Sequence, residues 1–290
     1  MTPQSGLRGA GEALAAPLPP LLAEAEHLAS TMLLGEHGRR RAGMGEEFWQ
    51  YRPAMASDEA RLIDWRRSAR GDTHYIRQKE WQAAQTVLIW VDGAQSMGFA
   101  SKGVPPKADR ARVLAMAVAI LLLRGGERVG LSGHDVPPRR GDVQLLRLAA
   151  GLLGDKTQGD YSAPDLTGML GRSRALFVSD FMGPFEGVEE ALTRAADRGV
   201  RGALVQVLDP EEEAFPYDGR VVFESMGGGL RHETLQAGAL RDRYLARLAE
   251  RKDRLAHLAR LTGWQYTCHH TGDSAQAPLL WLYRALEKTR

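Results

Sequence analysis

The residues best suited to chemistry follow two short apolar segments. Val87–Val91 leads to Asp92, and a turn of small residues then reaches Ser96. Leu176–Ser179 leads in the same way to Asp180. In an open α/β sheet the carboxyl ends of the strands form the ligand-binding edge, so we expect these side chains to gather there. Carboxylate and hydroxyl oxygens are ligands for a hard divalent cation, which makes this edge a candidate metal site.

Other chemistries leave weaker signals. The run Cys268–His270 contains adjacent histidines, which point to opposite faces of a strand, and no CxxC or HExxH spacing occurs. A hydrolytic triad of Ser96, His134 and Asp180 is conceivable, although no Gly-x-Ser-x-Gly elbow supports it. The chain lacks a Gly-x-x-x-x-Gly-Lys-Ser/Thr phosphate loop, so we do not expect it to use nucleotides itself.

The composition is that of a folded protein: of 290 residues, 43% are hydrophobic and 26% are charged. With 38 basic and 36 acidic residues, the formal net charge of +2 offers no global attraction to nucleic acid or membrane. Cys268 is the only cysteine, which excludes an internal disulfide and suits a reducing cytosol. The clean apolar run Val113–Leu123 is far shorter than the ~20 residues of a membrane span. No signal-peptide pattern is present, so we expect a cytoplasmic protein.

From Thr86 onward the pattern alternates between strands and helices. This alternation predicts an α/β fold, a doubly wound and mainly parallel sheet covered by helices on both faces. Strands are expected over Thr86–Asp92, Arg128–Gly133, Ala175–Asp180, Arg201–Leu208 and Trp264–His270, with a hairpin over Gly219–Glu233. Helices are expected over Leu21–Leu34, Lys107–Arg124, Asp142–Leu153, Pro164–Leu170, Gly187–Arg198, Leu240–Leu261 and Ala277–Lys288.

Three regions differ in composition. Residues 1–34 combine a loose start with a leading helix, and residues 83–290 carry the alternating pattern. Residues 35–82 are rich in Arg, Trp and Glu, which predicts a small β-rich subdomain held by aromatic contacts and Arg–carboxylate pairs. Because Arg, Trp and Tyr also concentrate at binding hot spots, docking of a partner is the functional interpretation. The basic run Arg39–Arg41 suits phosphate, but acidic residues follow closely and a solvated loop is the alternative.

The expected helix Leu240–Leu261 has an inner face of leucines and an outer face dense in arginine. We interpret it as an amphipathic cover helix with a charged outer face. A site for an acidic partner is the alternative interpretation.

The two strand-end acids resemble those of the von Willebrand factor A fold. There, an Asp-x-Ser-x-Ser loop, a threonine from a middle loop and an aspartate after the fourth strand bind one divalent ion. By this resemblance Asp92 matches the first acid, Ser96 the second serine and Asp180 the distal aspartate, with Mg²⁺ or Mn²⁺ as the ion. Ala94 replaces the first serine, and the middle loop 157–162 offers several oxygens without singling one out. We expect metal binding to be weak or lost, and both aspartates would then cap the following turns.

A second resemblance rests on motifs in residues 35–98. They are Gly35-x-His37-Gly38-Arg39, Gly43-x-Gly45-Glu46-Glu47-Phe48, Tyr51-Arg52 and Asp58-Glu59-x-Arg61-x-Ile63-Asp64-Trp65-Arg66-x-Ser68-Ala69-Arg70. Their order is similar to the bacterial "domain of unknown function fifty-eight" family, whose members carry a von Willebrand A-like domain. Many relatives are longer and carry membrane helices before this region, so this chain resembles a short, soluble version.

The family resemblance implies a non-enzymatic protein-interaction module. Relatives are typically encoded beside MoxR-type AAA+ ATPases, and von Willebrand A domains commonly serve as their adaptors. We therefore expect a MoxR-type ATPase as the partner, with the assembly or remodelling of client proteins as the task. The docking edge would consist of Asp92, Gln95, Ser96 and Asp180. A metal-assisted hydrolase at the same edge is the alternative, and nucleic-acid binding through Arg39–Arg41 is a weaker one.

Overall fold

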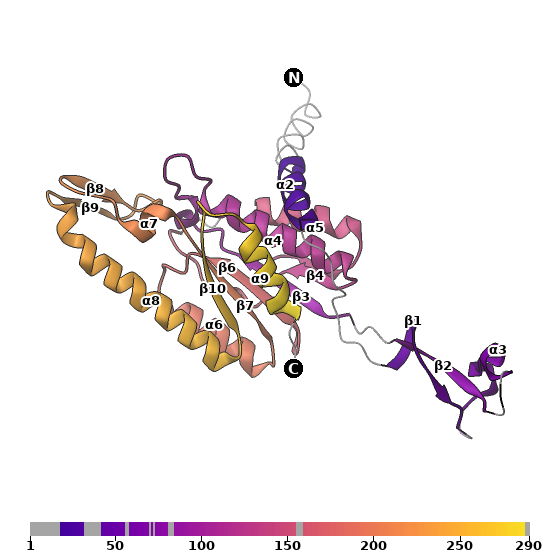
Figure 1. The fold of residues 1–290 in the computed structure, drawn as a ribbon. Coiled ribbons are helices and arrows are strands. Elements are labelled where there is room, and N and C mark those ends of the chain that lie inside the picture. The colour runs from indigo at the N-terminus through magenta and orange to yellow at the C-terminus, as the bar shows by residue number, and fades with distance from the viewer. Residues whose placement is uncertain are drawn as a thin grey trace. The chain divides into compact units, whose positions relative to one another are not determined.

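The computed structural model describes residues 18–31, 42–55, 58–69, 71, 73–80, 84–154 and 159–287. Contacts divide the chain into two compact units, Met1–Gly35 with Thr86–Arg290 as the larger and Glu36–Gln85 as the smaller. Figure 1 follows the chain through both units. The leading helix α2 (Leu18–Ser30) belongs to the larger unit, where it packs against α4 (Lys107–Arg124).

A six-stranded sheet forms the centre of the larger unit (Figure 1). The strand order is β10-β7-β6-β3-β4-β5, and all neighbours are parallel except β4 and β5. The winding direction reverses between β3 and β6, as in doubly wound folds. The expected doubly wound, mainly parallel α/β fold is therefore confirmed. The strands are β3 (Thr86–Val91), β4 (Arg128–Leu131), β5 (Val136–Arg139), β6 (Arg174–Ser179), β7 (Arg201–Leu208) and β10 (Gln265–His270).

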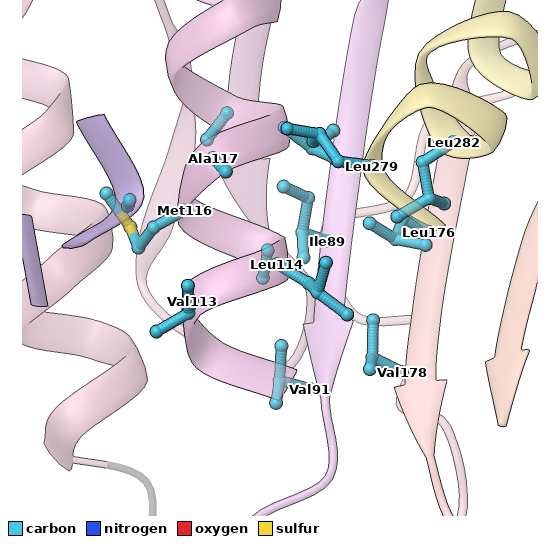
Figure 2. Packing of buried hydrophobic residues seen from close by; sticks show 14 of the residues in the cluster. Ile89, Val91, Val113, Leu114, Met116, Ala117, Leu176, Val178, Leu279 and Leu282 are labelled. Carbon is cyan, nitrogen blue, oxygen red and sulfur yellow. The ribbon is translucent and has the colours of Figure 1, made fainter. Parts of the chain in front are cut away.

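The central strands are apolar along their length because helices cover both faces of the sheet. Alternate residues of β3 enter different clusters: Ile89 and Val91 pack with α4, whereas Leu88 and Trp90 pack with helices of the opposite face. Figure 2 shows the first cluster, in which α4 and α9 lie over β3 and β6. The helices of the first face are α2, α4, α5 (Asp142–Gly154) and α9 (Gln276–Glu287), and those of the second are α6 (Phe185–Asp197) and α8 (Arg241–Thr262).

The helix α4 is apolar on almost every side. It is enclosed by the sheet, α2, α5 and α9, so a single polar stripe would not suit it. Within the described residues, no helix reaches the combined length and hydropathy that crossing a membrane requires.

Between β7 and α8 the chain makes an excursion that contains a short helix and a β-hairpin. It begins with α7 (Pro210–Ala214), continues as the hairpin of β8 (Val221–Glu224) and β9 (Arg231–Thr234), and ends in η3 (Ala237–Leu240). The expected hairpin and its glycine turn are confirmed. Gly228 has a φ of +70°, a conformation that glycine adopts without strain.

The smaller unit is built on an antiparallel pair of strands. These are β1 (Ala42–Pro53) and β2 (Tyr75–Glu80), with η1 (Ala60–Leu62) and α3 (Trp65–Ser68) between them. Asp64 caps α3, because its Oδ1 accepts the N–H of Arg67 at 3.0 Å. The Trp65 side chain beside this cap remains 58% exposed. The Ile-Asp-Trp segment therefore builds a capped turn that presents an indole ring.

One Arg–carboxylate pair of the expected kind links two segments of the smaller unit. Arg52 donates two hydrogen bonds to Asp58, each with an N–O distance of 2.6 Å. These bonds lower the pKa of Asp58 to about 2. The basic run Arg39–Arg41 lies outside the described residues.

One local prediction is wrong, and one strand is absent from the predicted set. Residues 164–170 form turns rather than a helix, because Asp165 accepts the N–H of Thr167 at 2.7 Å and Gly168 has a φ of +79°. The strand β5 was not expected, since it contains Pro137 and Pro138. As an edge strand that pairs with β4 alone, β5 tolerates the missing N–H groups.

Candidate functional site

Asp92 and Asp180 lie side by side at the carboxyl edge of the sheet, where the winding direction reverses. Asp92 follows β3 and Asp180 follows β6, and the N–H of Asp92 donates to the carbonyl of Val178 at 2.9 Å. Both aspartates are buried, with exposed fractions of 2% and 1%. This reversal is where open α/β sheets bind ligands. The structure thus brings the two acids together at a typical ligand position, but below the surface.

Three donors hold the carboxylate of Asp92. Its Oδ1 accepts the N–H of Ala94 at 2.8 Å and the hydroxyl of Ser162 at 2.5 Å, and its Oδ2 accepts the hydroxyl of Ser179 at 2.6 Å. Ser162 comes from the middle loop, in which the sequence alone singled out no oxygen. Burial raises the pKa of Asp92, whereas these three hydrogen bonds lower it. Burial is the larger effect and the charge of Asp180 adds to it, so the pKa is raised overall.

The positive charge at this edge comes from Lys107, the first residue of α4. Its ammonium lies 2.8 Å from Oδ2 of Asp180 and 2.7 Å from Oε1 of Glu212 in α7. The Lys107 side chain is only 1% exposed. Burial by itself lowers the pKa of Lys107, but the two carboxylates outweigh burial, so the pKa is raised overall. Lys107, Asp180 and Glu212 therefore form an ion triad in which Lys107 and Asp180 are buried and Glu212 is half-buried.

Sequence reasoning assigned no role to Lys107. A cation at a helix N-terminus faces the positive end of the helix dipole, which disfavours it. A lysine at the start of an apolar helix is therefore a signal that carboxylates lie nearby. The signal does not identify them, because Asp180 and Glu212 are 73 and 105 residues away along the chain.

Further hydrogen bonds fix the two acids of the triad. The carbonyl of Asp180 accepts a hydrogen bond from Nε2 of Gln206 at 2.8 Å. Oε1 of Gln206 in turn accepts a hydrogen bond from the hydroxyl of Tyr266 at 2.6 Å. Oε2 of Glu212 accepts the N–H of Asp209 at 2.8 Å and completes a capping box at α7. The triad is thus held by β7, β10 and α7 together.

Gln95 and Ser96 lie in the short helix η2 (Gln95–Gly98), next to the acids. Their N–H groups donate to the carbonyls of Gly159 and Asp160, each at 3.0 Å. The hydroxyl of Ser96 is buried and has no hydrogen-bond partner among the described residues. No described base therefore activates this hydroxyl, and the structure does not assemble the triad with His134 and Asp180.

The rim of this edge is formed by other side chains. Tyr161 is 40% exposed and Gln95 is half-buried. Tyr161 packs so closely on Gly183 that a Cβ there would lie 2.6 Å from the tyrosine Cβ. Burial and the charge of Asp180 raise the pKa of Tyr161. Sequence reasoning missed Tyr161, although an exposed aromatic residue in a loop at the ligand edge is a usable signal.

The von Willebrand A resemblance implies a divalent ion here, and the oxygens suit one poorly. Ala94 contributes no oxygen, and Asp92 already accepts three hydrogen bonds. Asp180 uses Oδ2 for Lys107 and Oδ1 for a backbone N–H at 3.0 Å. The unpartnered hydroxyl of Ser96 is the feature that would favour a ligand. The described residues also contain no group of three His, Cys, Asp or Glu side chains placed to hold a metal ion.

The run Cys268–His270 does not form a reactive site. Burial raises the pKa of the Cys268 thiol to about 11 and lowers the pKa of His269 to about 4. His270 instead places Nε2 3.0 Å from Glu213. The thiol and the neighbouring imidazole are therefore both neutral at physiological pH.

The family described as "Protein of unknown function DUF58" matches residues 50–254. The chain belongs to this family. The expected family membership is confirmed, and the DUF58 match spans both compact units. No curated protein matches the chain.

Solved structures give weaker likenesses. An aerotolerance-related membrane protein from Bacteroides fragilis NCTC 9343, crystallised with multiple mutations to serines, is 14% identical with a TM-score of 0.41. The conserved hypothetical protein BatB from Bacteroides thetaiotaomicron is 16% identical with a TM-score of 0.39. Each alignment covers 71% of this DUF58 chain and 100% of the other.

Replacement of Lys107 by methionine should destabilise the larger unit by about 3–5 kcal/mol, because buried Asp180 and half-buried Glu212 then lose their cation. Urea unfolding at pH 7 measures this loss, and the exposed Lys102→Met variant is the control, expected within about 0.5 kcal/mol of wild type. In wild type the raised pKa of Lys107 makes its contribution fully present below about pH 10 and lost at higher pH. A loss no larger than that of the control would contradict the ion triad.

The Asp92→Asn variant should show a pH-dependent change in stability. A carboxyl with a raised folded-state pKa favours folding when protonated, so its contribution is present below about pH 3.9 and lost as the pH rises through the folded-state value. The variant should therefore be more stable relative to wild type at pH 7 than at pH 4. Urea unfolding at both pH values tests this, with exposed Asp197→Asn as the control. An equal difference at both pH values would refute the raised pKa.

Proposed function

We propose that this DUF58 chain is a non-enzymatic protein-interaction module that binds a MoxR-type AAA+ ATPase at the carboxyl edge of its sheet. The family match supports the proposal, because the resemblance to this family implies such an ATPase as the partner. The strand order, with its single antiparallel edge strand among the described residues, supports a von Willebrand A-like domain. The task would be the assembly or remodelling of client proteins.

The observation that carries the proposal is the mutual pairing of the charged groups at this edge. Asp180 and Glu212 bind Lys107, and Asp92 is held by hydroxyl and amide donors. Ser96 has no described base within hydrogen-bond distance. General acid–base catalysis needs a group free to exchange a proton with a substrate. The edge therefore favours binding over the alternative of hydrolysis.

The residues of the expected docking edge take different roles in this proposal. Asp92 and Asp180 are buried, so they position the loops rather than contact a partner. Gln95 and Tyr161 are accessible and would make the contacts. The hydroxyl of Ser96 is buried as well, so Ser96 is assigned no direct contact with the partner.

In the same proposal, the ammonium of Lys107 takes the electrostatic role that a divalent ion has in von Willebrand A domains. A fixed cation between two carboxylates gives the edge a permanent charge pattern without a dissociable metal. The partner interaction would then persist in the presence of EDTA, apart from any magnesium that the ATPase needs for its nucleotide.

The docking edge is tested by capture of the purified MoxR-type ATPase encoded in the same genome. The double variant Gln95→Ala/Tyr161→Ala should weaken capture at least about tenfold, a loss of ~1.4 kcal/mol. Leu261→Ala removes a more exposed apolar side chain, 71% against 40% for Tyr161, at the far end of α8 and should bind as wild type does. Full binding by the double variant would show that the edge is not the docking site.

The role of Lys107 predicts how the protein responds to Mg²⁺ and Mn²⁺. Wild type should show no change in melting temperature with either ion, because the ammonium of Lys107 is already paired with the carboxylates of Asp180 and Glu212. The double variant Ala94→Ser/Lys107→Ala adds an oxygen and removes the cation, so either ion should stabilise it, by about 2.7 kcal/mol at a concentration of 100 Kd. Sub-millimolar Mg²⁺ binding by wild type that disappears in Asp92→Ala, measured by calorimetry, would contradict this role.

A further inference from the structure

A groove of about 410 Å³ lies between the β8–β9 hairpin and α8, apart from the docking edge. Its floor is apolar, and its rim carries positive charge. The floor is formed by Phe215, Phe223, Leu240 and Tyr244, and the rim carries Arg243 and Arg247.

The floor is a preformed aromatic surface. The ring of Phe215 stacks on Phe223 at a centroid distance of 5.7 Å and lies 4.8 Å from the ring of Tyr244. Phe215 has a φ of +44°, a left-handed conformation that is unfavourable for a bulky residue. Its carbonyl accepts Nε of Arg241 at 3.0 Å, which helps to hold this conformation. Strain of this kind concentrates at binding and switch regions.

The rim is an unpaired line of arginines along α8. Arg243 and Arg247 are exposed and lie one helical turn apart. Among the ion pairs of the described residues, none includes either of them. A second hollow of about 300 Å³ continues from Arg247 and is lined by Glu250, Arg251 and Arg254. The groove therefore opens onto further positive charge.

We propose that this groove binds an acidic amphipathic segment of a partner protein. A large apolar side chain would lie on the aromatic floor, and carboxylates one helical turn apart would pair with Arg243 and Arg247. The arginine fork binds a carboxylate through two parallel hydrogen bonds, which gives direction as well as charge. The inference rests on the proposed function only in that both make the chain a protein-binding module, because the groove and the docking edge use different residues.

A peptide fits the groove better than a nucleic acid does. Phosphate binding draws on several lysines and arginines along a continuous basic track. Here the groove offers two exposed arginines, Arg243 and Arg247, beside an aromatic floor, and exposed acids interrupt the basic surface at Glu224 and Asp242. A short segment with two carboxylates and one large apolar side chain matches this set better than an extended phosphate backbone does.

A random peptide library displayed on phage, selected on the full-length chain, tests the groove. Selected peptides should be enriched in Asp or Glu beside Leu, Phe or Trp. Their synthetic versions should bind at least about tenfold more weakly to the Arg243→Glu/Arg247→Glu variant, measured by fluorescence anisotropy. The Arg128→Glu/Arg260→Glu variant reverses two other exposed arginines and should bind as wild type does. An unchanged melting temperature checks the folding of each variant.

The outcomes separate this proposal from the docking edge. The proposed binding of an acidic segment would be refuted by any of three results. They are the selection of peptides that are not acidic, the selection of no peptide, and equal binding to both charge-reversed variants. Binding of a single-stranded oligonucleotide in place of peptides, lost in the Arg243→Glu/Arg247→Glu variant, would overturn it in favour of nucleic acid. Peptide binding should survive in Gln95→Ala/Tyr161→Ala, and ATPase capture should survive in the groove variant. Loss of one activity alone therefore identifies which of the two assignments has failed.

Discussion

The ion triad of Lys107, Asp180 and Glu212 is the interaction on which the candidate site depends. Lys107 begins α4, Asp180 follows β6 and Glu212 lies in α7, so three charges join a helix, the sheet and the segment after β7. Moving an ammonium out of water is costly, and the dipole at the start of α4 opposes it further. Two carboxylates at hydrogen-bond distance offset that cost. Such a cluster determines geometry more than it adds net stability, because an apolar replacement of the whole triad could fold equally well.

The triad also determines what the neighbouring acid can do. Asp180 pairs with Lys107, so the two aspartates do not share a cation. Asp92 instead accepts hydrogen bonds from the hydroxyls of Ser162 and Ser179. Each charged group at the edge then has its partners within the protein. The acids therefore hold the loops of this edge in place from below the surface, which is the part that they take in the proposed function.

The fold was largely predictable, and the interior of the site was not. Strands buried on both faces appear as continuous apolar runs, which is why the alternation after Thr86 predicted the sheet correctly. The role of Lys107 was not predictable, because its partners are distant along the chain and its hydrocarbon stem resembles that of any helix lysine. Ser162 and Ser179 gave no signal, since serine is common in loops and its role depends on tertiary contacts. The family motif predicted membership, whereas Asp64 within it proved to be a helix cap.

Asp160 connects the docking edge physically to the hairpin that lines the groove. Its carbonyl accepts the N–H of Ser96 at 3.0 Å, and its carboxylate accepts the N–H of Gly227 at the hairpin turn. A Cβ at Gly227 would overlap that carboxylate, so a larger residue there would force the Asp160 side chain to move. An isolated two-stranded hairpin is marginally stable, and it therefore relies on contacts of this kind. Asp160 thus ties the hairpin turn and the N–H of Ser96 to one residue, so a displacement of the hairpin would break a bond made by the loop that also holds Ser96.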